Sequence, residues 1–240
     1  MKPVSKQNLL FKDEIDITNK IKLRIPTLGE ILDDEDNYYS LVTLFTATPY
    51  DLMVQLDDLG IDFTTINDYQ LFLIMFDTIK EYDTKILFKD TDFSKFKLFT
   101  DDKNQRIILK DEENDVIIDP IVHEQIAEAL RKINNLTKNT KKPANEEAKK
   151  YLLERARKRL RRSINKYKSD GLENIIVSLI NTEQFKYNFK TVKDLTIYQF
   201  NMSLNQVVKK INYDNLMYGV YAGTIDAKKL DSKSLNWIKE

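Results

Sequence analysis

The spacing of the apolar residues changes along this 240-residue chain, and this change limits the fold more than any other feature. Between residues 15 and 25 apolar and polar residues alternate, which predicts a half-exposed strand or hairpin arm. Short β-branched and aromatic runs between residues 84 and 118, with a polar turn at residues 101–104, predict a small antiparallel meander. Helical spacing elsewhere completes an α+β fold class: a mixed N-terminal domain with a small antiparallel sheet, then an all-helical C-terminal region.

A polar stretch divides the chain at residues 134–146, and its composition is typical of a linker. We predict an acidic, mixed α+β domain at residues 1–133 and a basic, aromatic-rich helical domain at residues 147–240. Within the second domain we expect helices over residues 146–168, 172–182 and 194–211. A final helical segment is expected to include Leu235 and Trp237.

Charge is segregated although the formal net charge is zero. Between residues 25 and 78 the chain has eleven acidic residues and no lysine or arginine. Between residues 131 and 168 it has fifteen basic residues and three acidic ones. This asymmetry predicts a charge match within the chain or between subunits, or a separate acidic partner for the basic part. The simpler alternative is a pair of solvated faces that differ in charge.

The basic part centres on a predicted helix whose apolar residues lie three or four positions apart and share one face: Leu153, Ala156, Leu160 and Ile164. The remaining surface carries candidate contact residues: Arg155, Arg157, Lys158, Arg159, Arg161 and Arg162. These cations would bind an acidic protein surface, bind the phosphates of a nucleic acid, or only keep the helix soluble. No aromatic platform lies within the run, and no known nucleic-acid-binding pattern is recognisable, which weakens the second interpretation.

Aromatic residues are concentrated in the last part of the chain. Core packing is their usual role, but an exposed subset would mark an interface, because tyrosine and tryptophan provide large contact areas at low entropy cost. The candidates are Tyr198, Phe200, Tyr218, Tyr221 and Trp237.

The chain shows no recognisable catalytic or metal-binding motif. It has no cysteine, and it lacks phosphate-binding glycine loops, a nucleophile elbow and an H-E-x-x-H pair. The one histidine, His123, has no nucleophile or second metal ligand at a convincing spacing, which favours a structural role. The acidic runs lack the spacing of a calcium-binding loop. We therefore predict no enzyme, no catalytic residue, no metal and no cofactor.

Segments of the C-terminal third resemble a known class of proteins: DLTIYQFNMSLNQV at 194–207, YDNLMYGVYAG at 213–223 and LNWI at 235–238. They are similar to proteins from the tail and baseplate gene modules of contractile-tailed bacteriophages of Gram-positive hosts. TPYDLMVQLDDLGIDF at 48–63 has a weaker similarity of the same kind. The resemblance implies an assembly chaperone or a baseplate assembly factor, and it brings no site residues with it.

Together these features predict a non-enzymatic phage tail or baseplate assembly protein that acts through protein–protein contacts, or that is retained as a structural component. The expected partners are tail or baseplate proteins, and a second copy of the chain is a further option. The alternative is a nucleic-acid-binding protein that uses the basic helix 149–166. The most apolar run, Leu71 to Phe76, is too short to cross a membrane. We expect no membrane partner, and a location in the host cytoplasm or the virion tail.

Overall fold

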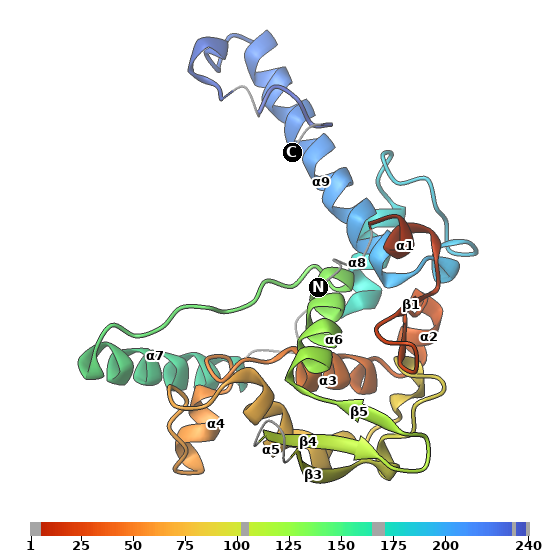
Figure 1. Cartoon of the computed structure of the whole chain (residues 1–240). Coiled ribbons are helices and arrows are strands. Elements are labelled where there is room, and N and C mark those ends of the chain that lie inside the picture. Colours follow the sequence, from red (N-terminus) through yellow and green to blue (C-terminus); the bar gives the residue numbers. More distant parts are fainter. Residues whose placement is uncertain (1–5, 102–105, 165–170, 232–233, 239–240) are drawn as a thin grey trace.

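The structure is a computed structural model, and it describes residues 6–101, 106–164, 171–231 and 234–238. The α-helices are α1 (Lys6–Phe11), α2 (Leu28–Asp33), α3 (Glu35–Thr46), α4 (Met53–Asp58), α5 (Asp68–Ile79), α6 (Pro120–Ile133), α7 (Glu146–Ile164), α8 (Leu172–Ile180) and α9 (Ile197–Tyr221). The strands are β1 (Glu14–Asp16), β2 (Lys22–Arg24), β3 (Lys97–Asp101), β4 (Arg106–Asp111) and β5 (Val116–Ile118). Two small antiparallel sheets and a helical C-terminal region confirm the predicted α+β class (Figure 1).

The two sheets both lie in the N-terminal half. β1 and β2 pair as a short antiparallel hairpin, with Ile15 opposite Leu23 and both side chains buried, so residues 15–25 form two strands and not the single strand or hairpin arm that was predicted. β3, β4 and β5 form a meander in sequence order. The meander is shorter than predicted, because the preceding residues form the 3-10 turns η1 (Thr84–Ile86) and η2 (Phe93–Lys95). Leu87 and Phe88 are both 0% exposed, and two consecutive buried side chains do not suit a strand with one exposed face.

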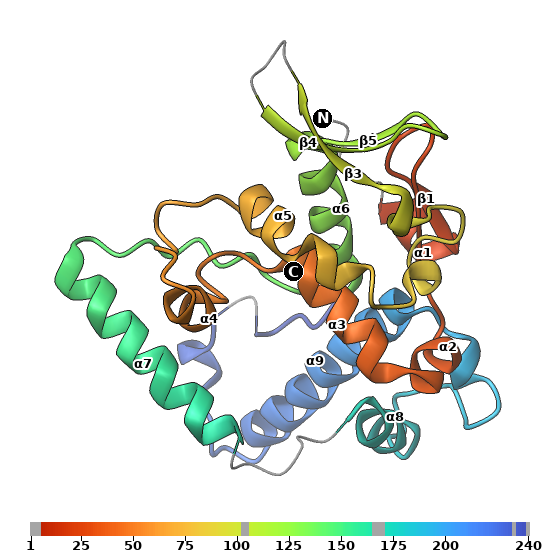
Figure 2. The same cartoon turned by 90° about the horizontal axis from the view of Figure 1, so that it is seen from below.

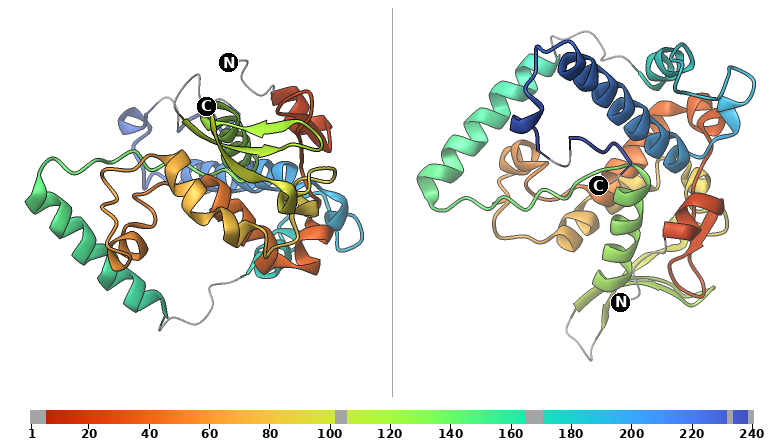
Figure 3. Two further views of the ribbon diagram at one scale, coloured as in Figure 1. Left: turned by 60° about the horizontal axis from the view of Figure 1, so that its bottom comes forward. Right: turned by 90° about the horizontal axis from the view of Figure 1, so that it is seen from above.

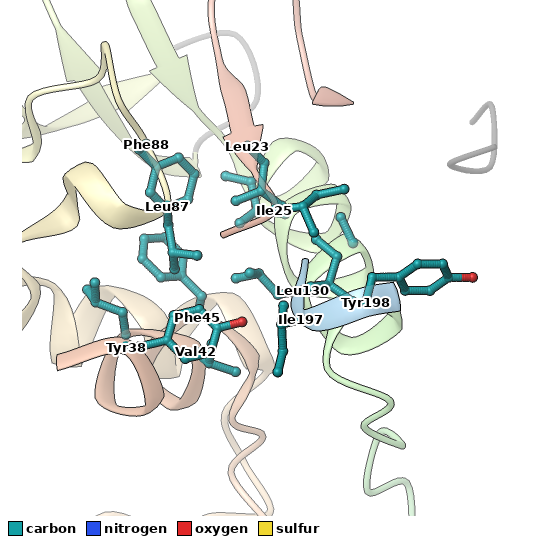
Figure 4. Close-up of a cluster of buried hydrophobic side chains, with 14 of the residues drawn as sticks. Leu23, Ile25, Tyr38, Val42, Phe45, Leu87, Phe88, Leu130, Ile197 and Tyr198 are labelled. Atoms are coloured by element: carbon teal, nitrogen blue, oxygen red, sulfur yellow. The ribbon is translucent and has the colours of Figure 1, made fainter. Parts of the chain in front are cut away.

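One hydrophobic core joins segments from both halves of the chain. It contains Phe45 of α3 and Leu130 of α6, together with Ile176 of α8 and Ile197 and Phe200 of α9. Figure 4 shows Ile197, at the start of α9, near Phe45 and Leu130. Burying a large apolar side chain contributes about 1.5–3 kcal/mol. The first half of α9 is therefore an integral part of the core.

Two capping boxes set the start of α9 beside α2. The Thr27 hydroxyl accepts a hydrogen bond from the Glu30 amide, and the Glu30 carboxylate accepts one from the Thr27 amide at 2.9 Å. Thr196 caps α9 in the same way with Gln199. The backbones of Thr27 and Thr196 pair in an antiparallel bridge. The N-terminal part of the chain thus fixes the position and direction of α9.

The chain after residue 211 differs from the prediction. α9 continues to Tyr221 and ends where Gly223 adopts a φ of +72°. The chain then folds back through η4 (Ala227–Lys229), and residues 234–238 are turns and bends. The helix predicted around Leu235 and Trp237 is therefore wrong for the described residues. The physical reason is a contact with α9: the Gln206 side-chain amide donates to the Trp237 carbonyl at 3.1 Å.

Residues 134–145 connect α6 to α7 without helix or strand (Figure 3). The predicted domain boundaries there stay a prediction, because packing in a shared core does not show where one folding unit ends. Two other predicted features lie outside the described residues: most of the turn at 101–104 and the end of the basic helix at 165–168. No helix in the described part of the chain combines the length and apolar character needed to cross a bilayer.

Candidate interaction surfaces

α7 lies along one edge of the molecule, with α4 on its inner side (Figure 2). Its start is capped by Asn145, whose side-chain oxygen accepts a hydrogen bond from the Ala148 amide at 2.8 Å. None of the side chains from residue 146 to 162 is buried. α7 is therefore held by contacts at its surface and not by a core of its own.

Ion pairs attach α7 to the acidic segment around α4. The Arg157 guanidinium donates to Asp57 at 2.6 Å and to Asp58 at 2.5 Å. The Lys149 ammonium donates to Asp62 at 2.5 Å. The acidic and basic stretches thus meet within the chain, which is one of the alternatives that the sequence left open.

These contacts change the pKa values of the paired groups. The hydrogen bond from Lys149 is the main cause that lowers the pKa of Asp62 to about 2. The same bond raises the pKa of Lys149, and the hydrogen bonds to Asp57 and Asp58 raise the pKa of Arg157. All of these side chains remain partly exposed, between 20% and 58%. Solvent and salt therefore screen the attachment, and it is sensitive to ionic strength.

The other candidate cations of α7 are exposed, and we call them the outward cations: Arg155, Lys158, Arg159, Arg161 and Arg162. None of them has a carboxylate partner among the described residues, in contrast to Arg157. The apolar residues of α7 lie on the side of Arg157 and Lys149, which faces α4. One helix therefore has an attached side and a free, cationic side.

The second half of α9 projects from the rest of the molecule (Figure 1). We call residues 208–238 the arm, and none of its described side chains is buried. Tyr218 and Tyr221 are 73% and 79% exposed. The helical residues from 211 onward carry a single charge, Asp214, which pairs with Lys210 at 2.5 Å. An almost uncharged, tyrosine-bearing helix with no buried side chain has the composition of a protein-binding surface.

The remaining aromatic candidates lie elsewhere. Tyr198 and Phe200 are 9% and 1% exposed, because the first turns of α9 pack into the core. The prediction that these two side chains form an interface is wrong. Trp237 is half-buried, with the Lys210 ammonium 5.6 Å from its ring centroid. Trp237 therefore fixes the returning segment against α9.

A pocket of about 400 Å³ lies where the 134–145 segment crosses the starts of α5 and α6. At this pocket the Lys138 ammonium lies 2.7 Å from Asp68 and 2.9 Å from Glu124, and Arg131 lies 3.5 Å from Glu124, so two cations balance the two carboxylates. His123 is 2% exposed, and its ring stacks on Phe72 with 4.4 Å between centroids. Burial lowers the pKa of His123 to about 4, so the imidazole is neutral near pH 7. The part of the chain that the structure describes has no group of three or more metal-binding side chains.

The sequence did not reveal which acidic residues meet the basic helix. Charge segregation indicated a match, but the structure selects Asp57, Asp58 and Asp62, while Glu35 instead accepts a hydrogen bond from the Leu172 amide at 3.1 Å. One available signal was the spacing of Lys149 and Arg157, which places both on the apolar side of the helix.

Residues 165–240 match the model of a protein family described as the YomV second domain. YomV is a Bacillus phage-region protein. The C-terminal third of this chain is thus similar to a phage-associated domain family from a Gram-positive host. Comparison with curated proteins and with solved structures gave no match.

The matched residues include α8, α9 and the arm. The similarity to a phage protein therefore falls on the part of the chain that carries Tyr218 and Tyr221. This similarity supports the broader prediction of a phage protein of a Gram-positive host. It does not show what the protein does in the phage.

Proposed function

We propose that this protein is a non-enzymatic phage tail or baseplate assembly protein that acts through protein–protein contacts. The observation that carries the proposal is the arm: residues 208–238 have no buried side chain among those described, and Val208, Tyr218 and Tyr221 are 46%, 73% and 79% exposed. Large apolar and aromatic side chains exposed on one element are typical of a partner-binding surface, which supports the proposal. The similarity to a phage-associated family over the same residues supports the proposal that this partner is a phage protein.

The arm would act as a chaperone-like cover. Tyrosine offers a large, stiff contact area, and covering one exposed ring removes on the order of 100 Å² of apolar surface, worth about 2–3 kcal/mol. Tyr218 and Tyr221 would bind an aggregation-prone surface of a tail or baseplate subunit until that surface enters the particle. A chain that stays bound afterwards would be a structural component of the tail.

The test is site-specific photo-crosslinking in a host that produces the phage. A benzophenone amino acid replaces Tyr221 in one sample and Phe189 in the other. Phe189 is the matched control, because it is 65% exposed but lies outside the arm. We expect position 221, and not position 189, to crosslink to a tail or baseplate subunit. Equal crosslinking from both positions, or crosslinks from 221 to proteins unrelated to the tail, would show the proposal to be wrong.

A further inference from the structure

The free side of α7 suggests a second binding activity, separate from the arm. We propose that the outward cations bind the phosphate backbone of double-stranded nucleic acid without regard to base sequence. The attached side of α7 is already occupied by contacts to Asp57, Asp58 and Asp62. That attachment holds the helix at the edge of the molecule and leaves its other side exposed (Figure 2).

The density of charge fits a duplex. Residues 155–162 contain the five outward cations and Arg157, and no acidic residue. At about 1.5 Å per residue they cover about 10 Å of helix. A duplex presents one negative charge per ~1.7 Å of its axis, hence roughly six charges over the same length. The five outward cations are therefore close in number to the roughly six phosphate charges.

The arrangement around the helix also favours a duplex over a single acidic strand. Arg159 and Arg161 are two positions apart, which separates their side chains by about 160° around the axis. Lys158, Arg162 and Arg155 lie on the arc between them, on the side opposite α4. A linear acidic peptide could contact only the cations along one line of the helix. The two phosphate backbones that border a groove can contact the cations at both ends of the arc, Arg159 and Arg161.

The lack of apolar residues on the outward side within residues 155–162 argues against a protein partner for this stretch, although Tyr151, 63% exposed, lies on the same side nearer the start of α7. Protein interfaces have a buried centre that is depleted of charge and enriched in apolar and aromatic residues. Within residues 155–162 the apolar residues are Ala156 and Leu160, and both lie on the α4 side of the helix. The outward side of residues 155–162 carries only cations and therefore suits phosphates, where counterion release supplies the binding free energy.

The test measures binding of the full-length protein to a fluorescent duplex of mixed sequence and about two turns, ~21 base pairs. The fluorescence anisotropy of the duplex gives the binding constant K at salt concentrations from about 50 to about 200 mM. One variant replaces Arg155, Lys158, Arg159 and Arg162 with Gln. The control variant replaces four exposed cations on other elements with Gln: Lys89, Lys97, Lys190 and Lys193. Both variants lose the same net charge.

We expect the α7 variant to bind the duplex at least about tenfold more weakly at low salt. The slope of log K against log salt should become less negative by about 3 to 4, because four cations are removed. The control variant should keep the wild-type slope. A third variant with Arg155, Arg159, Arg161 and Arg162 replaced by Lys should keep most of the binding, because the charge is retained.

Other outcomes would overturn the proposal. Absence of duplex binding at about 50 mM salt would do so, as would equal losses in the α7 variant and the control. Poly-L-glutamate serves as the acidic-protein probe. If it binds as tightly as the duplex and depends on the same residues, the surface takes an acidic protein and not a nucleic acid. The arm is unchanged in every variant, so none of these results bears on crosslinking at Tyr221.

Discussion

At the scale of single residues, His123 shows how burial changes the chemistry of a side chain. Its ring is 2% exposed and stacks on Phe72 at 4.4 Å. Desolvation is the main cause that lowers the pKa of His123 to about 4, and Arg131 and Lys138 add to it while Asp68 opposes it. The folded protein therefore keeps the imidazole neutral where the unfolded chain, with an ordinary pKa of 6.5, takes up a proton.

This pKa difference predicts a pH-dependent stability. The contribution of neutral His123 is fully present above pH 6.5 and is lost as the pH falls toward about 4. At pH 5 the free energy of unfolding should be lower than at pH 7 by about 2 kcal/mol from this residue alone. Urea unfolding at both pH values measures it. His123→Gln is the control, since it does not titrate, and its stability should change much less between the two pH values. An equal change in both proteins would contradict the assignment.

Some residue roles could be predicted from the sequence and others could not. The Thr27–Glu30 capping box and the structural role of His123 depend on local pattern and on the absence of partner groups, which a sequence shows directly. The burial of Tyr198 and Phe200 depends on which side of α9 meets α6, and an aromatic-rich helix does not reveal this by itself. The meander predicted from residue 84 begins only at Lys97, since tertiary burial of both Leu87 and Phe88 overrode local preference.

At the scale of elements, α7 is a helix with a sequence-specified apolar side and a tertiary attachment made of ion pairs. Its existence was predictable from the spacing of Leu153, Ala156 and Leu160. The identity of its partner was not, because pairing between residues about a hundred positions apart depends on how the chain folds. The greater length of α9 was also missed: the helix continues past residue 211 to Tyr221, and Gly223, with its positive φ, follows its end.

The attachment of α7 predicts a local effect of Arg157→Gln. Removing the two hydrogen bonds to Asp57 and Asp58 should increase amide hydrogen exchange in α7 several-fold, while exchange in α3 and α6 stays unchanged. Higher salt should have the same effect on the wild type. Arg161→Gln is the matched control, because the outward cations have no carboxylate partner among the described residues. Faster exchange in both variants, or in neither, would show that Arg157 does not hold the helix.

At the scale of the whole molecule, the core and the arm have separate tasks. The core joins α3, α5 and α6 to α8 and the first half of α9, so the C-terminal helices are needed for the fold. The arm contributes no buried side chain among its described residues. The positions of charged and aromatic residues in the sequence do not show which half of α9 is buried and which is exposed. Only the tertiary structure shows this.

A truncated variant comprising residues 1–207 should therefore keep the fold but no longer bind its partner. We expect its melting temperature to lie within about 3 °C of the full-length value, because few stabilising contacts are removed. Phe200→Ala in the full-length chain is the contrasting variant, and it should cost about 3–5 kcal/mol because it opens a cavity in the core.

The most direct measurement of the central claim is capture from nuclease-treated lysate of a host that produces the phage, with the full-length chain and the 1–207 chain as baits. Nuclease treatment removes any contribution from nucleic acid on α7. We predict that the full-length chain recovers tail or baseplate subunits and that the folded 1–207 chain does not. Recovery of the same subunits by both baits would contradict the assignment of partner binding to the arm.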